Sequence, residues 1–337
     1  MQHLSPAYFA LVMATGIVSI AAWDFDLTIL ALALFAFNLA AFAALVVLTV
    51  LRAIRYPRPF IADMTDHQVG PGFFTMVAGA CILGAQFLLL THSVIVATAL
   101  LALSAVAWIG LTYGIFTALT VKRTKPPLEK GVSGAWLIAV VATQSIAVLV
   151  SLIARDAPQP LRLELNFVAL SMWLWGGMFY IWIISLIFYR YTFLRFSPGD
   201  LTPPYWINMG AMAISTLAGA QLAQNVPDAP FLAALLPFLK GFTIFYWATG
   251  TWWIPMLIAL SVWQHLIMRF PLRYEPLVWG AVFPLGMYTV ATREMAAALE
   301  LPFLNALVPA IFAVALLAWA LACAGLIWDL GKLLRVR

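Results

Sequence analysis

The chain of 337 residues is 64% hydrophobic, and only 9% of its residues carry a charge. Soluble globular proteins have roughly a quarter of their residues charged, so this composition excludes water as the main solvent of the folded chain. The net charge of +5 does not indicate nucleic-acid binding, because the basic residues stand in small groups at the ends of apolar segments. Cys81 and Cys323 both fall inside apolar segments and indicate neither a disulfide nor a metal site.

Ten apolar segments follow one another along the chain, most of them near the roughly 20 residues that a helix needs to cross a bilayer. The expected spans are residues 6–22, 28–51, 71–90, 94–121, 131–153, 164–189, 203–223, 240–268, 276–296 and 303–328. The apolar stretch 231–239 is either an interfacial turn of helix or an extension of the eighth span. Since no stretch between the spans is long enough for a water-soluble domain, we expect a single transmembrane domain over residues 1–337.

Every even-numbered span ends in a group of basic residues. The groups are Arg52, Arg55 and Arg58; Lys122, Arg123, Lys125 and Lys130; Arg190 and Arg195; Arg269 and Arg273; and Lys332, Arg335 and Arg337. They place 14 of the 18 Lys and Arg residues on one side of the membrane. The positive-inside rule then predicts that both termini are cytoplasmic, and we expect a bacterial plasma (inner) membrane.

A short pattern opens every odd-numbered span: a proline, two further residues and a large aromatic residue, with serine in place of proline in the third copy. The aromatic residues are Phe9, Phe74, Trp136, Trp206 and Trp279, which stand 65, 62, 70 and 73 residues apart. Proline suits the first turn of a helix, where its missing N–H leaves no hydrogen bond unmade, so the pattern predicts a helix start. The repeating unit is a helical hairpin, with approximate bounds 1–60, 61–125, 126–195, 196–270 and 271–337.

Five hairpins of the same orientation fit a quasi-fivefold ring with the odd spans inside. The odd spans contain more Gly, Ala, Ser and Thr than the even spans, and polar groups that face hydrocarbon are costly. We therefore predict an all-α integral membrane protein of ten transmembrane helices, in which the odd helices line a central pore. The predicted pore-lining residues are Met13, Gly16, Ser19, Ala78, Cys81, Val140, Thr143, Gly210, Ala213, Gly286 and Thr289.

Span nine holds the candidate gate. Phe283 is the one aromatic ring in the layer four residues beyond the repeat aromatics. It is either an ordinary packing residue or a hydrophobic constriction, which can close a pore by excluding water. Pro284 follows directly and cannot donate to the helix ladder, so we expect a kink beside the ring. Arg293 stands about 15 Å farther along and either attracts anions, pairs with Glu294 or reaches the headgroups.

Other chemistries lack the residues that they need. No Lys, Arg, Asp or Glu lies in the middle of a span, so there is no obvious proton relay. The four histidines are too scattered for paired haem ligation, and the loop cluster of Asp63, Asp66 and His67 favours a solvated connection. We expect no cofactor, no metal and no enzymatic activity. The alternatives are a multispan membrane enzyme or redox protein, and a non-transporting membrane assembly or sensor.

Three features together resemble the tellurite-resistance and dicarboxylate transporter family: the opening segment Pro6–Ser19, the repeated hairpins, and Val282-Phe283-Pro284 in span nine. That family includes bacterial tellurite-resistance proteins, fungal malate and sulfite transporters and plant slow anion channels. The resemblance implies a central pore closed by Phe283 and commonly a homotrimer in membrane lipid, but it does not carry over the substrate. The ring of repeats without charge in the middle of the spans leads us to expect a small inorganic or carboxylate anion as substrate. C4-dicarboxylate, tellurite, sulfite and halide all remain open as substrates.

Overall fold

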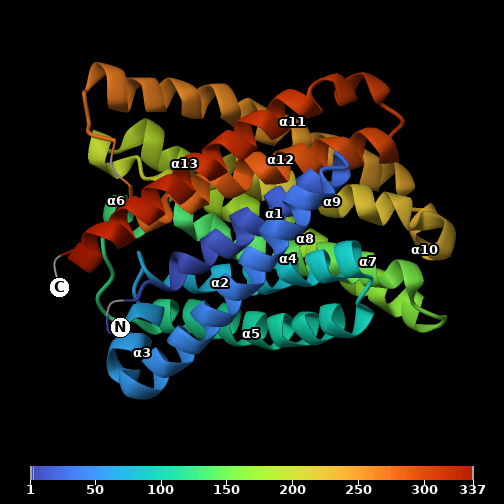
Figure 1. Cartoon of the computed structure of the whole chain (residues 1–337), viewed down its shortest axis with the longest axis horizontal. Helices are drawn as coiled ribbons and strands as arrows, with labels where there is room; N and C mark the ends of the chain where they lie inside the picture. Colours follow the sequence, from blue (N-terminus) through green and yellow to red (C-terminus); the bar gives the residue numbers. More distant parts are fainter. Residues whose placement is uncertain (1, 3, 273, 336–337) are drawn as a thin grey trace.

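A computed structural model describes residues 2, 4–272 and 274–335, and every regular element within them is a helix. A long helix covers each of the ten predicted spans (Figure 1). The first helices of the five hairpins are α1 (Phe9–Asp24), α4 (Phe74–Thr91), α7 (Ile138–Asp156), α9 (Ile207–Gln224) and α12 (Trp279–Ala298). The second helices are α2 (Thr28–Arg55), α5 (Val94–Val121), α8 (Leu161–Phe193), α11 (Leu236–Val262) and α13 (Val308–Arg335). Short connecting helices are α3 (Pro57–Met64), α6 (Leu128–Gly131) and α10 (Pro230–Ala233).

Seven of the long helices in the described part of the chain are both long and apolar enough to cross a membrane. They include all three first helices and all three second helices of the first three hairpins, together with the segment Val308–Asp329 of α13. The remaining three, α9, α11 and α12, are more polar or more aromatic. On α9, for example, Asn208, Ser215 and Gln221 lower the mean hydropathy. Two of them nevertheless pack on the apolar helices, α9 on α7 and α8 and α12 on α1 and α13, whereas α11 packs mainly on α9.

The proline–aromatic pattern marks helix starts, as predicted. A short 3₁₀ turn precedes each first helix, and these turns are Pro6–Tyr8, Gly70–Phe73, Gly134–Leu137, Pro203–Trp206 and Pro276–Val278. In the third copy Ser133 stands in for proline, and its hydroxyl caps the turn by accepting a hydrogen bond from the Ala135 N–H. That copy also differs in register: its α-helix begins at Ile138, two residues beyond the aromatic, whereas the fourth begins one residue beyond Trp206 and the other three begin at the aromatic itself.

First and second helices differ in burial. Within the apolar windows of the first three hairpins, 83% to 100% of first-helix residues are buried, against 17% to 44% of second-helix residues. Each first helix packs against the second helix that follows it. The first helices also contact one another: α1 packs on α4 and α12, α4 on α7, α7 on α9, and α9 on α12. The second helices therefore carry most of the exposed apolar surface.

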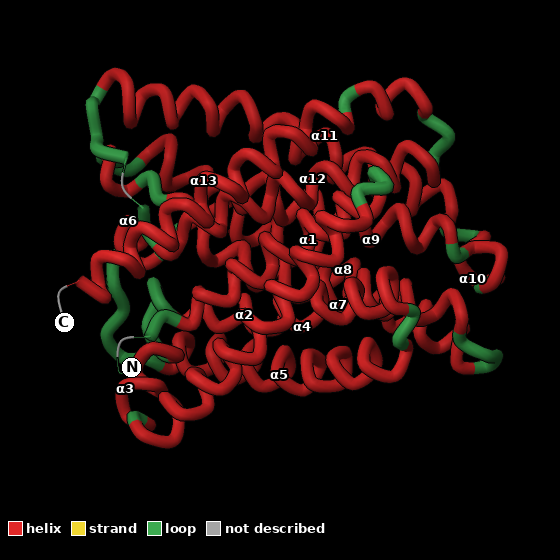
Figure 2. The backbone as a smooth tube through the Cα atoms, viewed as in Figure 1, coloured by secondary structure: helices red, strands yellow, loops and turns green. Residues whose placement is uncertain are grey.

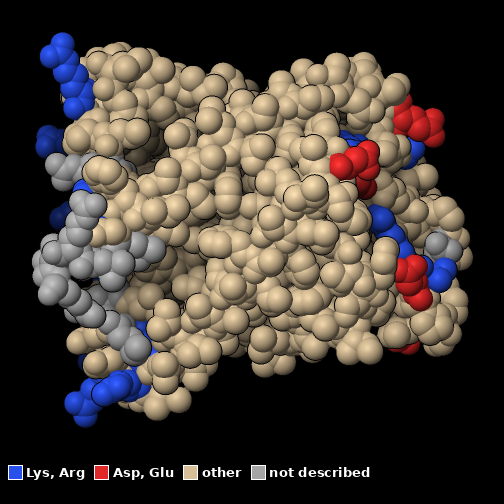
Figure 3. All heavy atoms as spheres, viewed as in Figure 1, with Lys and Arg blue, Asp and Glu red and all other residues tan. Residues whose placement is uncertain are grey.

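The two ends of the helices differ in charge. In the space-filling view Lys and Arg gather at one end, while the visible Asp and Glu lie at the other end with a few basic residues (Figure 3). We call these the basic end and the acidic end. The start of α1 and the end of α13 both lie at the basic end (Figure 1). The tube view shows that loops connect the helices at both ends (Figure 2).

The ambiguous stretch before span eight divides into two parts. Residues Pro230–Ala233 form the short helix α10, and α11 begins at Leu236, so residues 236–239 extend the span. At its other end α11 continues as a π-helical turn, Trp263–Ile267. Within that turn the Gln264 amide donates hydrogen bonds to the carbonyl oxygens of Pro198 (2.7 Å) and Leu201 (2.9 Å). These bonds fasten the end of α11 to the segment that leads into α9.

Candidate functional site

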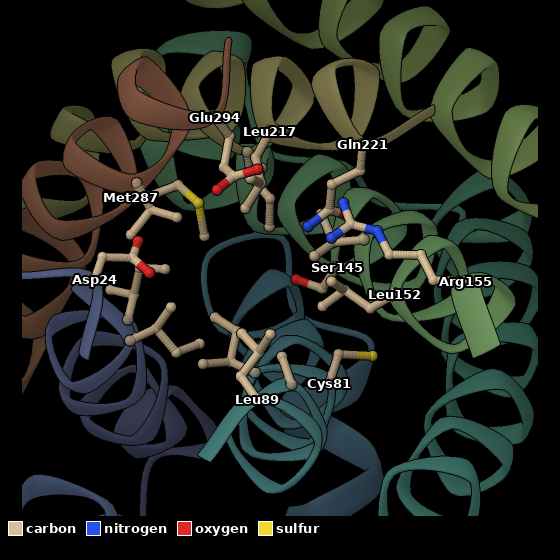
Figure 4. A pocket seen from close by; sticks show the side chains of 17 residues that line it. Asp24, Cys81, Leu89, Ser145, Leu152, Arg155, Leu217, Gln221, Met287 and Glu294 are labelled. Carbon is tan, nitrogen blue, oxygen red and sulfur yellow. The ribbon is translucent and has the colours of Figure 1, made fainter. Parts of the chain in front are cut away.

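A cavity lies among the five first helices, toward the acidic end, and residues of all five helices line it (Figure 4). Its volume is about 70 Å³, which is room for several water molecules. Most of its lining is apolar. The polar lining residues are Asp24, Ser145, Arg155, Gln221 and Glu294, together with the thiol of Cys81.

The lining follows one face of each first helix. From the centre of the helices toward the acidic end it forms three layers: Ile17, Ile82, Ser145, Ile214 and Met287; then Ile20, Ala85, Val148, Leu217 and Val290; then Asp24, Leu89, Leu152, Gln221 and Glu294. Successive layers on a helix are three or four residues apart, which is the spacing of a single helix face. The first layer lies eight residues beyond the repeat aromatic on four helices and nine residues beyond it on α7.

One helical turn deeper, toward the basic end, the same faces carry a fully buried layer. Its residues are Met13, Ala78, Val141, Gly210 and Phe283, each four residues before a member of the first lining layer. Phe283 is 1% exposed and Met13 is 2% exposed, and none of the five residues lines the cavity. The cavity thus stops above this layer. On α7 the member is Val141 instead of the predicted Val140, because that helix is shifted by one residue relative to its aromatic.

The residue after Phe283 fixes how closely two first helices approach. Pro284 lies inside α12, where it packs on Gly210 of α9. A Cβ atom added at Gly210 would come within 2.7 Å of the Pro284 ring. A real Cβ atom does not approach another carbon so closely, so only glycine fits here without movement of α12.

The predicted pore-lining residues divide into several groups. Cys81 lines the cavity. Gly16 and Gly286 lie at helix contacts, where a Cβ would meet Ile82 and Ile17 respectively. The other small residue of this layer, Ala213, is buried outside the lining, as are Met13, Ala78, Val140 and Gly210. Gly16 and Gly286 therefore allow neighbouring helices to pack closely, one position away from the lining face.

The predicted hydroxyl groups make hydrogen bonds to their own or a neighbouring helix, and they do not line the cavity. Ser19 donates to the Ala31 carbonyl of α2 at 2.8 Å. Thr143 donates to the Ala139 carbonyl and accepts from the Trp108 indole of α5, both at 2.8 Å. Thr289 donates to the Leu285 carbonyl at 3.0 Å. Ser145, which the pattern of small residues passes over, is the hydroxyl that lines the cavity.

The structure places the charged residues of the acidic end differently from what we expected from the sequence. Arg293 donates to the backbone oxygen of Asp24 and lies over the Phe25 ring, 6.0 Å from its centroid, and it does not line the cavity. Arg155, Asp24 and Glu294 do line it. Sequence reasoning missed these three because charges at span ends look like headgroup anchors. Extending the helix-face spacing from Phe283 through Met287 and Val290 would have reached Glu294.

A hydrogen-bond network holds Arg155 at the cavity. Its Nη2 donates to the Gln224 Oε1 at 2.6 Å, and its Nε donates to the Asn225 Oδ1 at 3.3 Å. The Gln224 amide in turn donates to the Glu294 carboxylate at 2.9 Å. Asn225 is fixed by its own bonds to the Ser151 carbonyl and the Asn166 side chain, both at 2.9 Å. Neutral amides therefore stand between the guanidinium of Arg155 and the carboxylate of Glu294.

The apolar surface of the second helices, the buried first helices and the cavity among them define an integral membrane protein of the transport class. A family model described as a voltage-dependent anion channel matches residues 3–327 of this chain. The chain belongs to that family, which confirms the resemblance inferred from its sequence. It is accordingly a membrane anion transporter or channel.

Curated relatives agree with this class. An uncharacterized transporter of Methanocaldococcus jannaschii is 26% identical over 308 residues, covering 86% of this chain and 84% of the relative. A second uncharacterized transporter of the same organism is 26% identical over 302 residues, covering 86% and 83%. An uncharacterized membrane protein of Mycobacterium tuberculosis is 39% identical over 152 residues, which is 45% of this chain and 77% of that protein.

Proposed function

We propose that the whole chain is one transmembrane domain that conducts small anions along the axis of a quasi-fivefold ring formed by α1, α4, α7, α9 and α12. The observation that carries this proposal is the cavity, which receives one stripe of residues from each of these helices. The mutual contacts of the first helices support the same arrangement. We propose that transport is passive or weakly coupled; in the described part of the chain, the charged side chains on the stripes form no direct ion pair with one another.

Phe283 is the proposed gate. It occupies the same face of α12 as Met287, Val290 and Glu294, which line the cavity, and it is the largest side chain of its layer. A layer of buried apolar side chains excludes water and therefore blocks a hydrated ion. Pro284 beside it packs directly on Gly210. A shift of α12 against α9 would therefore move the ring together with the helix contact.

The proposed cargo is a small inorganic or carboxylate anion, within the class of halides, sulfite, tellurite and C4-dicarboxylates. Family membership and the guanidinium of Arg155 in the cavity support an anion. The basic end is proposed to face the cytoplasm of a bacterial cell, with the cavity open to the outside. A homotrimer with one path in each subunit is the proposed assembly.

The proposal is tested by reconstituting the purified protein into liposomes and measuring ion-replacement currents and uptake. We expect flux of chloride, nitrate, malate or sulfite above that of protein-free vesicles, with a reversal potential that follows the anion gradient and not the potassium gradient. Folded, monodisperse protein that carries none of these anions would contradict the proposal. Co-purification of a chromophore or metal would instead favour the alternative of a membrane enzyme or redox protein.

A further inference from the structure

Arg155, the basic residue that lines the cavity, forms no direct ion pair with a carboxylate among the described residues. The recorded partners of Arg155 are the neutral amide oxygens of Gln224 and Asn225, which engage Nη2 and Nε. No hydrogen bond is recorded for its Nη1 within the described part of the chain. Because both amides hold the guanidinium from the same network, its position is fixed without a direct ion pair. A fixed cation at the wall of the cavity attracts an anion that enters it.

A second polar group points into the same cavity without a partner. Gln221 of α9 lines the cavity and is only 4% exposed. Its Oε1 atom is buried and has no hydrogen-bond partner in the described part of the chain. Because Oε1 only accepts hydrogen bonds, a water molecule or another donor has to satisfy it, and only Nε2 of the same amide can donate to an anion. Arg155 and Gln221 both point into the opening, from the neighbouring helices α7 and α9 (Figure 4).

The opposite wall carries two carboxylates. Asp24 of α1 and Glu294 of α12 lie across the opening from Arg155 (Figure 4). Their charged neighbour is Arg293, which bonds to the backbone oxygen of Asp24 and stays outside the lining. With both carboxylates ionised, the lining carries one positive and two negative charges. The net lining charge is then −1, and its repulsion grows with the charge of the ligand, so a doubly charged anion at Arg155 is disfavoured relative to a singly charged one.

We propose that Arg155 and Gln221 form a binding site for one small monovalent anion in this cavity, and that Asp24 and Glu294 weaken the site when they are ionised. The proposal rests on the proposed function and adds to it a preference for singly over doubly charged anions. The Nε2 group of Gln221, which makes no hydrogen bond within the described part of the chain, donates to an anion held by Nη1 of Arg155. Each ionised carboxylate repels an anion held at Arg155, so neutralising either one strengthens anion binding.

The test compares the half-saturating nitrate concentration for flux into proteoliposomes at constant ionic strength and pH 7. We expect Arg155→Gln to raise it about tenfold or more, because the main attractive charge is lost. Gln221→Leu raises the half-saturating nitrate concentration severalfold. The double variant Asp24→Asn, Glu294→Gln lowers the half-saturating concentration, because both repulsive charges are removed. Lys240→Gln, which removes a charge from the acidic end outside the cavity, is the matched control and leaves it unchanged.

A second readout separates this site from transport. Nitrate should raise the melting temperature of detergent-solubilised wild type in a saturable way, more than sulfate does, and Arg155→Gln should lose that stabilisation. An unchanged half-saturating concentration in Arg155→Gln, with flux intact, overturns the site and leaves the proposed function standing. Absence of flux in every variant, with nitrate stabilisation retained in wild type and lost in Arg155→Gln, supports the site and contradicts conduction.

Discussion

Replacing Phe283 by alanine is expected to raise anion flux on the order of tenfold or more, because it removes the largest side chain of the buried layer that ends the cavity. Phe283 is 1% exposed, so truncation leaves a void directly below Met287 on the same helix face. Water can enter such a void from the cavity and form a continuous connection along the axis of the first helices. Flux per reconstituted protein molecule is the quantity to measure.

Truncating a buried phenylalanine also lowers stability by about 3–5 kcal/mol, so the flux comparison needs a folded variant and a control. Phe283→Leu keeps part of the bulk and should give an intermediate flux. Phe73→Ala is the matched control, since Phe73 is also 1% exposed but packs edge-on against Phe60 at the basic end. Equal flux in folded Phe283→Ala and Phe73→Ala would show that the ring does not close the path.

Arg190→Gln is expected to cause the largest loss of stability, roughly 3 kcal/mol or more, because it breaks a buried charge network. Arg190 of α8 is 5% exposed. It donates to the Val132 carbonyl (2.8 Å) and the Tyr205 hydroxyl, and it pairs with Asp200 at 3.0 Å. These partners precede α7 and α9, so one guanidinium joins the connections of two hairpins. Burial raises the pKa of Asp200, but hydrogen bonds from Ser197 and the charge of Arg190 outweigh it, and the pKa lies below its usual range.

Thermal unfolding in detergent, followed by tryptophan fluorescence, measures this effect. Arg195→Gln removes the same charge from the same end, where the side chain is exposed and has no recorded ion pair, and should change the melting temperature little. Similar melting temperatures for the two variants would contradict a structural role for the Arg190 network. Arg52 of the first hairpin makes an equivalent set of contacts: an ion pair with Asp63, a hydrogen bond to the Leu4 carbonyl and a contact with the Phe60 ring.

The helices were largely predictable because apolar length and the proline–aromatic pattern are local properties of the chain. Each predicted span coincides with a long helix, and each repeat of the pattern marks a helix start. The packing of the two helices of each hairpin was also predictable, because short loops bring consecutive helices together. The stretch 231–239 was ambiguous because its apolar residues suit both α10 and the start of α11, and only packing divides them.

The cavity lining was less predictable because it depends on how each helix is rotated about its axis. Small residues such as Gly16 and Gly286 attract attention in the sequence, yet they serve the contact between helices, one position from the lining face. The lining face of α7 differs by one residue when it is counted from Trp136, and α7 is the first helix that begins farthest beyond its aromatic residue, at Ile138. That shift brings Ser145 and Arg155 to the cavity, and spacing counted from the aromatic does not reveal it.

The most direct test of a path along the first helices is blockage by a charged thiol reagent at Met287, in the layer just above Phe283. Cys81 and Cys323 are first replaced by alanine, because Cys81 itself lines the cavity. Met287→Cys in this background should lose its anion flux when an anionic, membrane-impermeant methanethiosulfonate is added, whereas Ala297→Cys, exposed near the end of α12, should keep it. Complete labelling of Met287→Cys, verified by mass spectrometry, with flux unchanged would contradict conduction along this axis.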